Sequence, residues 1–188
     1  MAEKKYTPMM QHYLKMKEEN PDSILFYRLG DFYEMFFEDA KLVSQELDLV
    51  LTGRSAGVEE KVPMCGIPFH AANSYIQRLV KKGYKVAICE QLEDPSSAKG
   101  LVDRGIIKII TPGTYMDATM DAKSTNYMAS CDVSSFEITV IYCELSTGEL
   151  KYQTLQRSLV ALQKALLEQN VSELVCPMTM DKKWMAAL

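Results

Sequence analysis

Along the first 115 residues, segments with strand-like apolar runs alternate with segments whose apolar residues recur at helical spacing. This pattern predicts a mixed α/β fold. A helix is predicted behind Thr7-Pro8, where a capping hydroxyl precedes a proline suited to the first turn. Predominantly apolar runs predict strands over 24–29, 47–51, 85–89 and 106–110, the last of them broken by Lys108. Helical spacing predicts a helix after Glu34 and another over 71–82. The intervening residues are interpreted as a polar loop at 52–57, a tight Pro/Gly segment at 63–68 and a turn at 94–97.

The pattern changes after residues 116–126, which have no sustained period and are interpreted as a linker between residues 1–115 and 127–188. In the second part, Ser146-Thr147-Gly148-Glu149 predicts a hairpin turn between strands at 136–144 and 150–154. A helix around Leu162 and a strand beginning at Leu174 follow. A parallel sheet needs further elements to cover it, so we expect this second domain to be truncated and the chain to be an N-terminal fragment.

Gly30-Asp31-Phe32-Tyr33-Glu34 joins the apolar run at 24–29 to the next helix and is the most informative segment. Gly30 permits a turn that a residue with a Cβ would resist. On a helix, positions i and i+2 project roughly 200° apart, whereas in an extended segment they share one face. Phe32 and Glu34 can therefore act on one ligand only where the chain is not helical.

A purely structural interpretation of the same segment stays open. Asp31 could cap the following helix, with Glu34 three residues later closing a capping box. Phe32 would then be an ordinary core residue. Against this, Phe32 and Met35 lie off the apolar face of the expected helix, as side chains of a projecting surface would.

Charge and cysteine content narrow the class of protein. The net charge of −4 argues against a simple DNA clamp, because non-specific affinity comes from cations that meet phosphates. Five widely spaced cysteines without a Cys-x-x-Cys pair are typical of a reducing compartment and give no reason to expect a metal site. With neither a signal core nor an apolar stretch of about 20 residues, we expect a cytoplasmic chain that does not enter a membrane.

Five motifs in register resemble the N-terminal part of the MutS family of DNA mismatch repair proteins. They are Thr7-Pro8-Met9-Met10-Gln11, Phe26-Tyr27-Arg28-Leu29-Gly30-Asp31-Phe32-Tyr33-Glu34, Pro63-Met64-Cys65-Gly66-Ile67-Pro68-Phe69-His70-Ala71, Ala87-Ile88-Cys89-Glu90-Gln91 and Thr111-Pro112-Gly113-Thr114. The resemblance implies a mixed-sheet mismatch-recognition domain over 1–115. It also implies that residues 127–188 open a ribonuclease-H-like connector domain.

The resemblance further implies that Phe32 and Glu34 read mispaired or unpaired bases in duplex DNA, with Phe32 as a minor-groove wedge. Arg54, on a Gly/Ser loop, and Lys108, within an apolar strand, would face DNA, although each could equally be a solvated surface cation. Tyr33 and Met35 would support the DNA contact around the wedge. The expected partners are mismatched or looped duplex DNA and, through the connector domain, downstream repair proteins.

Enzymatic activity is not expected of these residues. The family's ATPase needs a Gly-x4-Gly-Lys-Ser/Thr loop, which the sequence lacks, so ATP, Mg²⁺ and homodimerisation are expected only of a full-length protein. The competing class is a metal-dependent nuclease using Asp132 or the acidic cluster Asp31, Glu34, Glu38 and Asp39. Two-metal chemistry requires converging carboxylates, whereas the helical phases scatter this cluster.

Overall fold

The computed structural model describes residues 6–93, 102–116 and 125–188. The chain divides into two compact units, Met1–Thr111 and Pro112–Leu188. This division falls just before the linker predicted at 116–126, most of which lies outside the described residues, as does the turn predicted at 94–97. Each unit is described by itself below.

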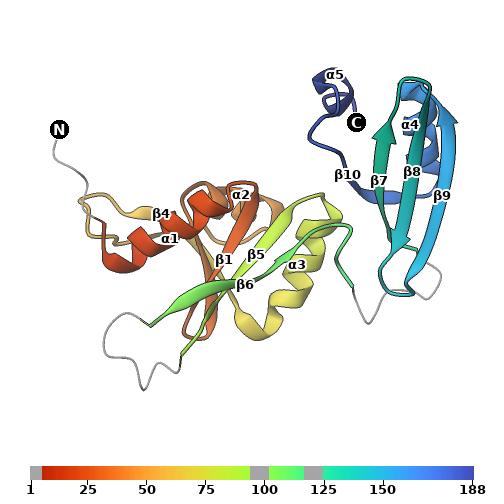
Figure 1. The fold of residues 1–188 in the computed structure, drawn as a ribbon. Coiled ribbons are helices and arrows are strands. Elements are labelled where there is room, and N and C mark those ends of the chain that lie inside the picture. The colour runs from red at the N-terminus through yellow and green to blue at the C-terminus, as the bar shows by residue number, and fades with distance from the viewer. Residues whose placement is uncertain (1–5, 94–101, 117–124) are drawn as a thin grey trace. The chain divides into compact units, whose positions relative to one another are not determined.

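The first unit is built on one six-stranded mixed sheet (Figure 1). Its strands are β1 (Ser23–Leu29), β2 (Phe32–Phe36), β3 (Thr52–Arg54), β4 (Val62–Pro68), β5 (Lys85–Gln91) and β6 (Arg104–Ile110). The order across the sheet is β3-β4-β2-β1-β5-β6, with β1 and β5 parallel and every other pair antiparallel. The prediction of a mixed α/β sheet is confirmed.

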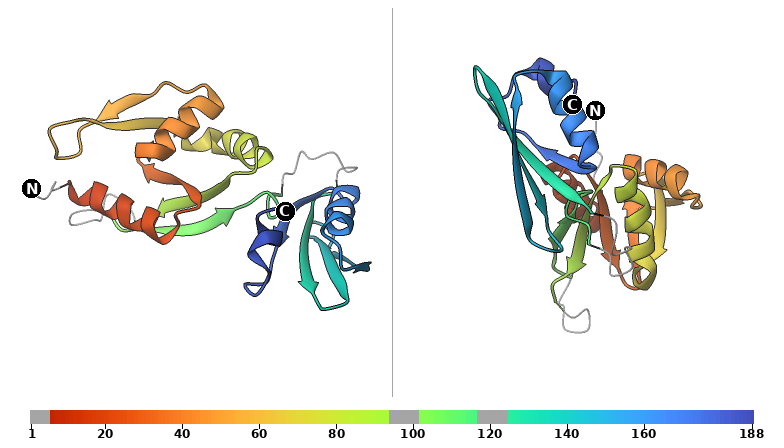
Figure 2. Two further views of the ribbon diagram at one scale, coloured as in Figure 1. Left: turned by 90° about the horizontal axis from the view of Figure 1, so that it is seen from above. Right: turned by 90° about the vertical axis from the view of Figure 1, so that its right-hand side faces the viewer.

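Helices cover both faces of this sheet, as the left view of Figure 2 shows. Helix α1 (Pro8–Glu19) lies on one face, and α2 (Phe37–Leu47) and α3 (Ala72–Lys81) lie on the other, with the short helix η1 (Phe69–Ala71) leading into α3. Thr7 caps α1 as predicted, because its hydroxyl accepts a hydrogen bond from the Met10 amide at 3.4 Å.

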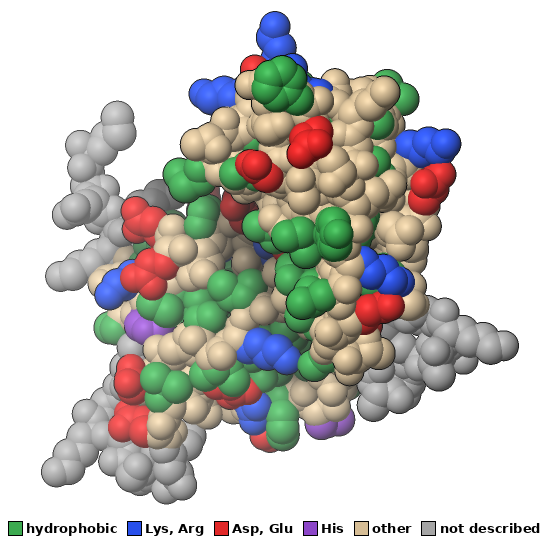
Figure 3. Space-filling view, turned by 45° about the vertical axis from the view of Figure 1, so that its right-hand side comes forward, with side chains coloured by type: hydrophobic (Ala, Val, Ile, Leu, Met, Phe, Trp, Pro, Cys, Tyr) green, Lys and Arg blue, Asp and Glu red, His purple; other side chains and the backbone are tan. Residues whose placement is uncertain are grey.

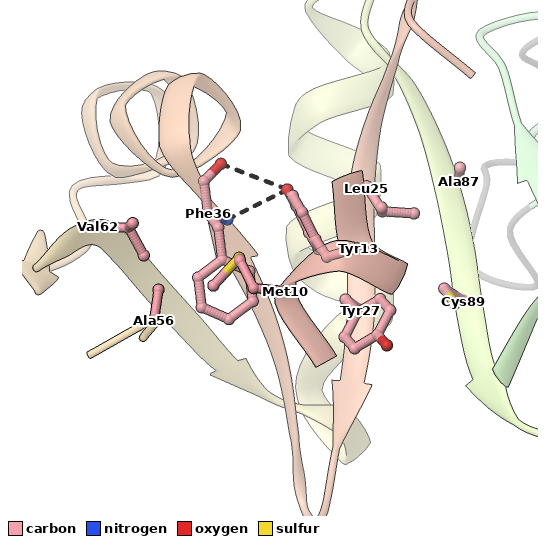
Figure 4. Packing of buried hydrophobic residues seen from close by; sticks show 9 residues of the cluster. All are labelled: Met10, Tyr13, Leu25, Tyr27, Phe36, Ala56, Val62, Ala87 and Cys89. Atoms are coloured by element: carbon pink, nitrogen blue, oxygen red, sulfur yellow. Dashed lines mark hydrogen bonds between the residues drawn. The ribbon is translucent and has the colours of Figure 1, made fainter. Parts of the chain in front are cut away.

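The core beneath α1 joins the helix to the four strands β1, β2, β4 and β5 (Figure 4). Tyr13 is buried between Tyr27 and Phe36, with its ring edge-on to both. Its hydroxyl accepts a hydrogen bond from the Phe36 amide at 3.2 Å and lies 3.3 Å from the Phe36 carbonyl oxygen. Such a buried, satisfied hydroxyl fixes where β2 ends and α2 begins.

Three sequence predictions in this unit are wrong in whole or in part. The polar loop predicted at 52–57 begins with the strand β3, so Arg54 lies at the end of a strand rather than on a Gly/Ser loop. Residues 47–51 do not form a strand, because α2 continues to Leu47 and ends at Asp48 with a left-handed φ of 57°. Residues 63–68 are not an isolated tight segment but most of β4, which pairs with both β2 and β3. The proline-flanked strand carries a misleading local signal, and its pairing with β2 and β3 decides its conformation.

The second unit is a four-stranded sheet with one helix packed on it. Its elements are β7 (Tyr127–Val133), β8 (Glu137–Glu144), β9 (Glu149–Gln156), α4 (Leu159–Glu168), β10 (Val171–Val175) and α5 (Lys182–Met185). The order is β10-β7-β8-β9, with β10 parallel to β7 and the other pairs antiparallel. The hairpin and helix are as predicted, but the last strand starts at Val171 rather than Leu174.

Within the described ranges, the helices are all too short or too polar to cross a lipid bilayer.

Candidate nucleic-acid interface

A two-residue hairpin turn places Phe32 at the tip of β2. Leu29 pairs with Phe32, so only Gly30 and Asp31 connect the strands. Gly30 has a φ of 57°, whereas Asp31 is not among the residues with positive φ. A positive φ at the first turn residue is a conformation that glycine adopts without the steric cost a Cβ would add. The turn leaves 47% of the Phe32 surface exposed.

Phe32 and Glu34 lie on the same face of the sheet, because β2 runs extended from Phe32 to Phe36. The prediction that this segment is not helical is confirmed. The capping-box interpretation is wrong: α2 begins at Phe37, and its N-cap position, Phe36, makes no side-chain capping hydrogen bond. Phe37 has a φ of 54°, so the chain turns abruptly from strand to helix at this residue.

Glu34 forms an ion pair with Arg54 that the sequence did not predict. The Arg54 Nη1 donates to Glu34 Oε2, and the two side chains are 36% and 15% exposed. Arg54 lies at the end of β3, with β4 between it and β2. Gly66 of β4 pairs with Glu34, and a Cβ built on Gly66 would lie 3.5 Å from Glu34 Cγ. The cationic carbon of Arg54 is also 5.9 Å from the centroid of the Phe36 ring.

Tyr33 and Met35 point to the opposite face, towards α2 and α3. Tyr33 is buried and donates its hydroxyl hydrogen to Glu90, and Met35 is fully buried. Burial, followed by the hydrogen bond to Glu90, raises the pKa of Tyr33 to about 12, so the hydroxyl stays protonated. The expectation that both residues support the DNA contact at the surface is therefore revised: they pack beneath the hairpin and stabilise it.

A cluster around Arg28, which the sequence analysis missed, holds the hairpin from that side. The Arg28 guanidinium carbon lies 3.7 Å from the centroid of the Phe69 ring, and its Nη1 lies 3.3 Å from Glu90 Oε1. The Phe69 amide donates to the Asp31 carbonyl oxygen at 2.9 Å. The sequence did contain a signal for this pair, since Arg28 and Glu90 carry opposite charges at the ends of two apolar strands.

Lys108 does not join the Phe32–Glu34 face. It is exposed on the edge strand β6 and pairs with Ile88 of β5. The neighbours of Ile88, Ala87 and Cys89, contribute to the core under α1, so Ile88 and Lys108 lie on the other face. Phe32 and Lys108 are also separated by the two central strands β1 and β5.

The carboxylates considered for a nuclease site do not converge on one point, and some of them are paired with lysines. Asp39 is buried and accepts hydrogen bonds from Lys17 Nζ and the Leu25 amide, each at 2.9 Å. Glu38 is exposed and pairs with Lys41 at 2.7 Å. Across 6–93, 102–116 and 125–188, no three His, Cys, Asp or Glu side chains gather as a metal site would require.

Surface charge gives little general attraction for a polyanion. On the face drawn in Figure 3, basic side chains of the described residues lie scattered among acidic ones rather than in one continuous patch. With a net charge of −4, recognition of DNA by this chain would depend on local contacts more than on its overall field.

The first unit thus presents an exposed ring and a carboxylate on one hairpin of a mixed sheet. Residues 7–119 match the family described as MutS domain I. The chain is 54% identical over 177 residues to the DNA mismatch repair protein MutS of Clostridium botulinum (strain Loch Maree / Type A3), covering 89% of this chain and 19% of that protein. It is 58% identical over 146 residues to that of Clostridium tetani (strain Massachusetts / E88), covering 77% and 17%.

The chain belongs to the MutS domain I family. It spans about a fifth of the length of the curated relatives it matches.

Proposed function

We propose that this chain recognises mispaired or unpaired bases in duplex DNA and so initiates mismatch repair, with Phe32 inserted through the minor groove. The observation that carries the proposal is the exposure of Phe32 at the tip of a hairpin, two residues from Glu34 on the same face. The membership of the family and the names of its relatives support it.

An aromatic wedge discriminates by deformation energy rather than by sequence. A mispaired base is already poorly stacked, so extruding it costs less than disturbing a normal step, for which partial unstacking costs a few kcal/mol. The Phe32 ring can stack on any base, because every base has a π-face, and such stacking contributes about 1–3 kcal/mol. Phe32 therefore supplies tolerance of different mismatches.

Glu34 supplies selectivity. Its carboxylate can accept a hydrogen bond from the edge of an extruded base. Because Glu34 and Phe32 share a face, the carboxylate lies beside the base step that the ring opens.

The test replaces Phe32 by alanine and measures binding to a labelled duplex with a G·T mismatch and to its matched control, by fluorescence anisotropy at low ionic strength. We expect weak binding overall and a preference for the mismatch, which Phe32→Ala abolishes. Loss of about 1–3 kcal/mol of stacking corresponds to roughly 5- to 150-fold in affinity.

Phe136 offers a matched control, since its ring is 88% exposed in the second unit. Phe136→Ala should leave the preference for mismatched duplex unchanged. If Phe32→Ala retained that preference, Phe32 would not be the wedge.

For the second unit, we propose the opening of a ribonuclease-H-like connector domain that docks downstream repair proteins. Three antiparallel strands, a helix and a fourth strand parallel to the first support this assignment. Binding of ATP with Mg²⁺ would belong to the remaining length that the relatives have, since no phosphate-binding Gly-x4-Gly-Lys-Ser/Thr loop occurs in this sequence. We propose that homodimerisation belongs to that remaining length as well.

A further inference from the structure

We propose that Arg54 is an exchangeable counterion of Glu34: it pairs with the carboxylate in the free chain and transfers to a DNA phosphate when Phe32 enters the duplex. The transfer frees Glu34 for the base. This inference rests on the function proposed above and adds a positioning residue, with a defined change of partner, to the mismatch reader.

The geometry of the free chain prepares this exchange. Arg54 reaches across β4 on the face that carries Glu34 and Phe36, and Gly66 leaves the space beside Glu34 without a side chain. The pair is unequally accessible, with Arg54 36% exposed and Glu34 15% exposed. A phosphate that approaches this face therefore meets the guanidinium more readily than the carboxylate.

The chemistry of arginine makes the exchange inexpensive. The planar guanidinium fork fits phosphate as well as it fits carboxylate, with charge-assisted hydrogen bonds in both cases. The Phe36 ring, 5.9 Å from Arg54 Cζ, stays beside the cation whichever anion it binds.

Neutralisation of Glu34 before contact also serves the encounter with DNA. An uncompensated carboxylate next to the wedge would repel phosphates over a Debye length, about 8–10 Å at moderate salt. The ion pair removes this repulsion while the surfaces approach. Glu34 loses its counterion only where an opened base step offers it a hydrogen-bond donor.

A double-mutant cycle tests the exchange through the sign of the coupling. Arg54→Ala, Glu34→Gln and the double variant are compared for binding to the G·T duplex. In the unmodified chain, part of the gain from an Arg54–phosphate contact is offset by the loss of the Arg54–Glu34 pair. Arg54→Ala should therefore weaken binding more in the Glu34→Gln background than in the unmodified chain, by roughly two- to fivefold for a partly exposed pair.

The salt dependence of binding gives a second measure. A phosphate contact by Arg54 predicts that Arg54→Ala lowers the slope of log K against log salt by about 0.9. Additive effects of Arg54→Ala and Glu34→Gln on binding, or an unchanged slope, would overturn the exchange.

Lys82 and Glu46 provide a matched control pair on the α2–α3 side, with Nζ and Oε2 2.6 Å apart and exposures of 47% and 27%. The effects of Lys82→Ala and Glu46→Gln on DNA affinity should be additive, because we expect this ion pair to stay intact when DNA binds.

A spectroscopic readout covers the case in which Arg54→Ala does not fold. Without DNA, Glu34→Gln should shift the NMR resonance of the Arg54 Nε–Hε group. With excess G·T duplex, the unmodified chain and the Glu34→Gln variant should give the same resonance for this group. A difference that persists with DNA would mean that the pair stays intact, contrary to the proposal. If Phe32→Ala keeps the mismatch preference, the proposed function itself fails; if the preference is lost but the cycle is additive, only the exchange fails.

Discussion

The turn before Phe32 gives the sharpest test of how the sequence sets the position of that ring. Gly30→Ala places a Cβ on a residue with a φ of 57°. A Cβ built there meets no atom within 4 Å, so the substitution causes no clash and its cost comes from the backbone alone. The left-handed conformation costs a residue with a Cβ about 1–2 kcal/mol.

Hydrogen exchange measures this cost where it arises. The Phe69 amide donates to the Asp31 carbonyl oxygen at 2.9 Å, so its exchange reports local opening of the turn. A cost of about 1–2 kcal/mol should accelerate that exchange roughly 5- to 30-fold in Gly30→Ala. The preference for mismatched duplex should fall as well, because Phe32 follows the turn directly.

Two variants of the same turn serve as controls. Asp31→Ala leaves the backbone conformation unchanged and should alter the exchange little, since the Asp31 carbonyl is the group that pairs with Phe69. Gly30→Asn should be milder than Gly30→Ala, because asparagine tolerates the left-handed region. Unchanged Phe69 exchange in Gly30→Ala would refute the argument that positive φ is what requires glycine here.

Two further predictions concern the packing of each unit. Asp39→Ala removes the acceptor for Lys17 and for the Leu25 amide, and should lower the free energy of unfolding by about 3–5 kcal/mol in urea titrations; a loss below about 1 kcal/mol would show that water replaces the carboxylate. In the second unit, hydrogen bonds from Thr147 and then from Ser146 lower the pKa of Glu144 from 4.5 to about 2. Its contribution to stability is therefore complete above pH 4.5 and lost as the pH falls towards 2, and Glu144→Gln should flatten thermal melting across that range; an unchanged pH dependence would contradict this.

Local residue patterns determined much of the first unit. The apolar run at 24–29, the glycine after it and the helical spacing beyond Glu34 predicted a strand, a turn and a helix, and β1, the Gly30 turn and α2 are all present. These features depend on neighbours in the sequence, so a local pattern can specify them. The same reasoning required an extended Phe32–Glu34 segment if both residues were to act on one ligand.

Local pattern failed where pairing between strands decides the outcome. The Asp31–Glu34 spacing fits a capping box as well as a strand, and only the hydrogen bonds of β2 to β1 and β4 extend the strand to Phe36. The apolar run at 47–51 gives no sign that the helix uses its first residue, Leu47. Secondary-structure propensity is a weak preference that tertiary contacts override.

The partners of the functional side chains came from the tertiary structure alone. Glu34 and Arg54 are 20 residues apart, and Arg28 and Glu90 are 62 apart. Each pair meets because the sheet order sets β3 two strands from β2 and places β5 beside β1. The sequence thus determined which residues carry the ring and the charges, whereas the order of the strands decided which charges neutralise one another, because ion pairing depends on distance in space and not along the chain.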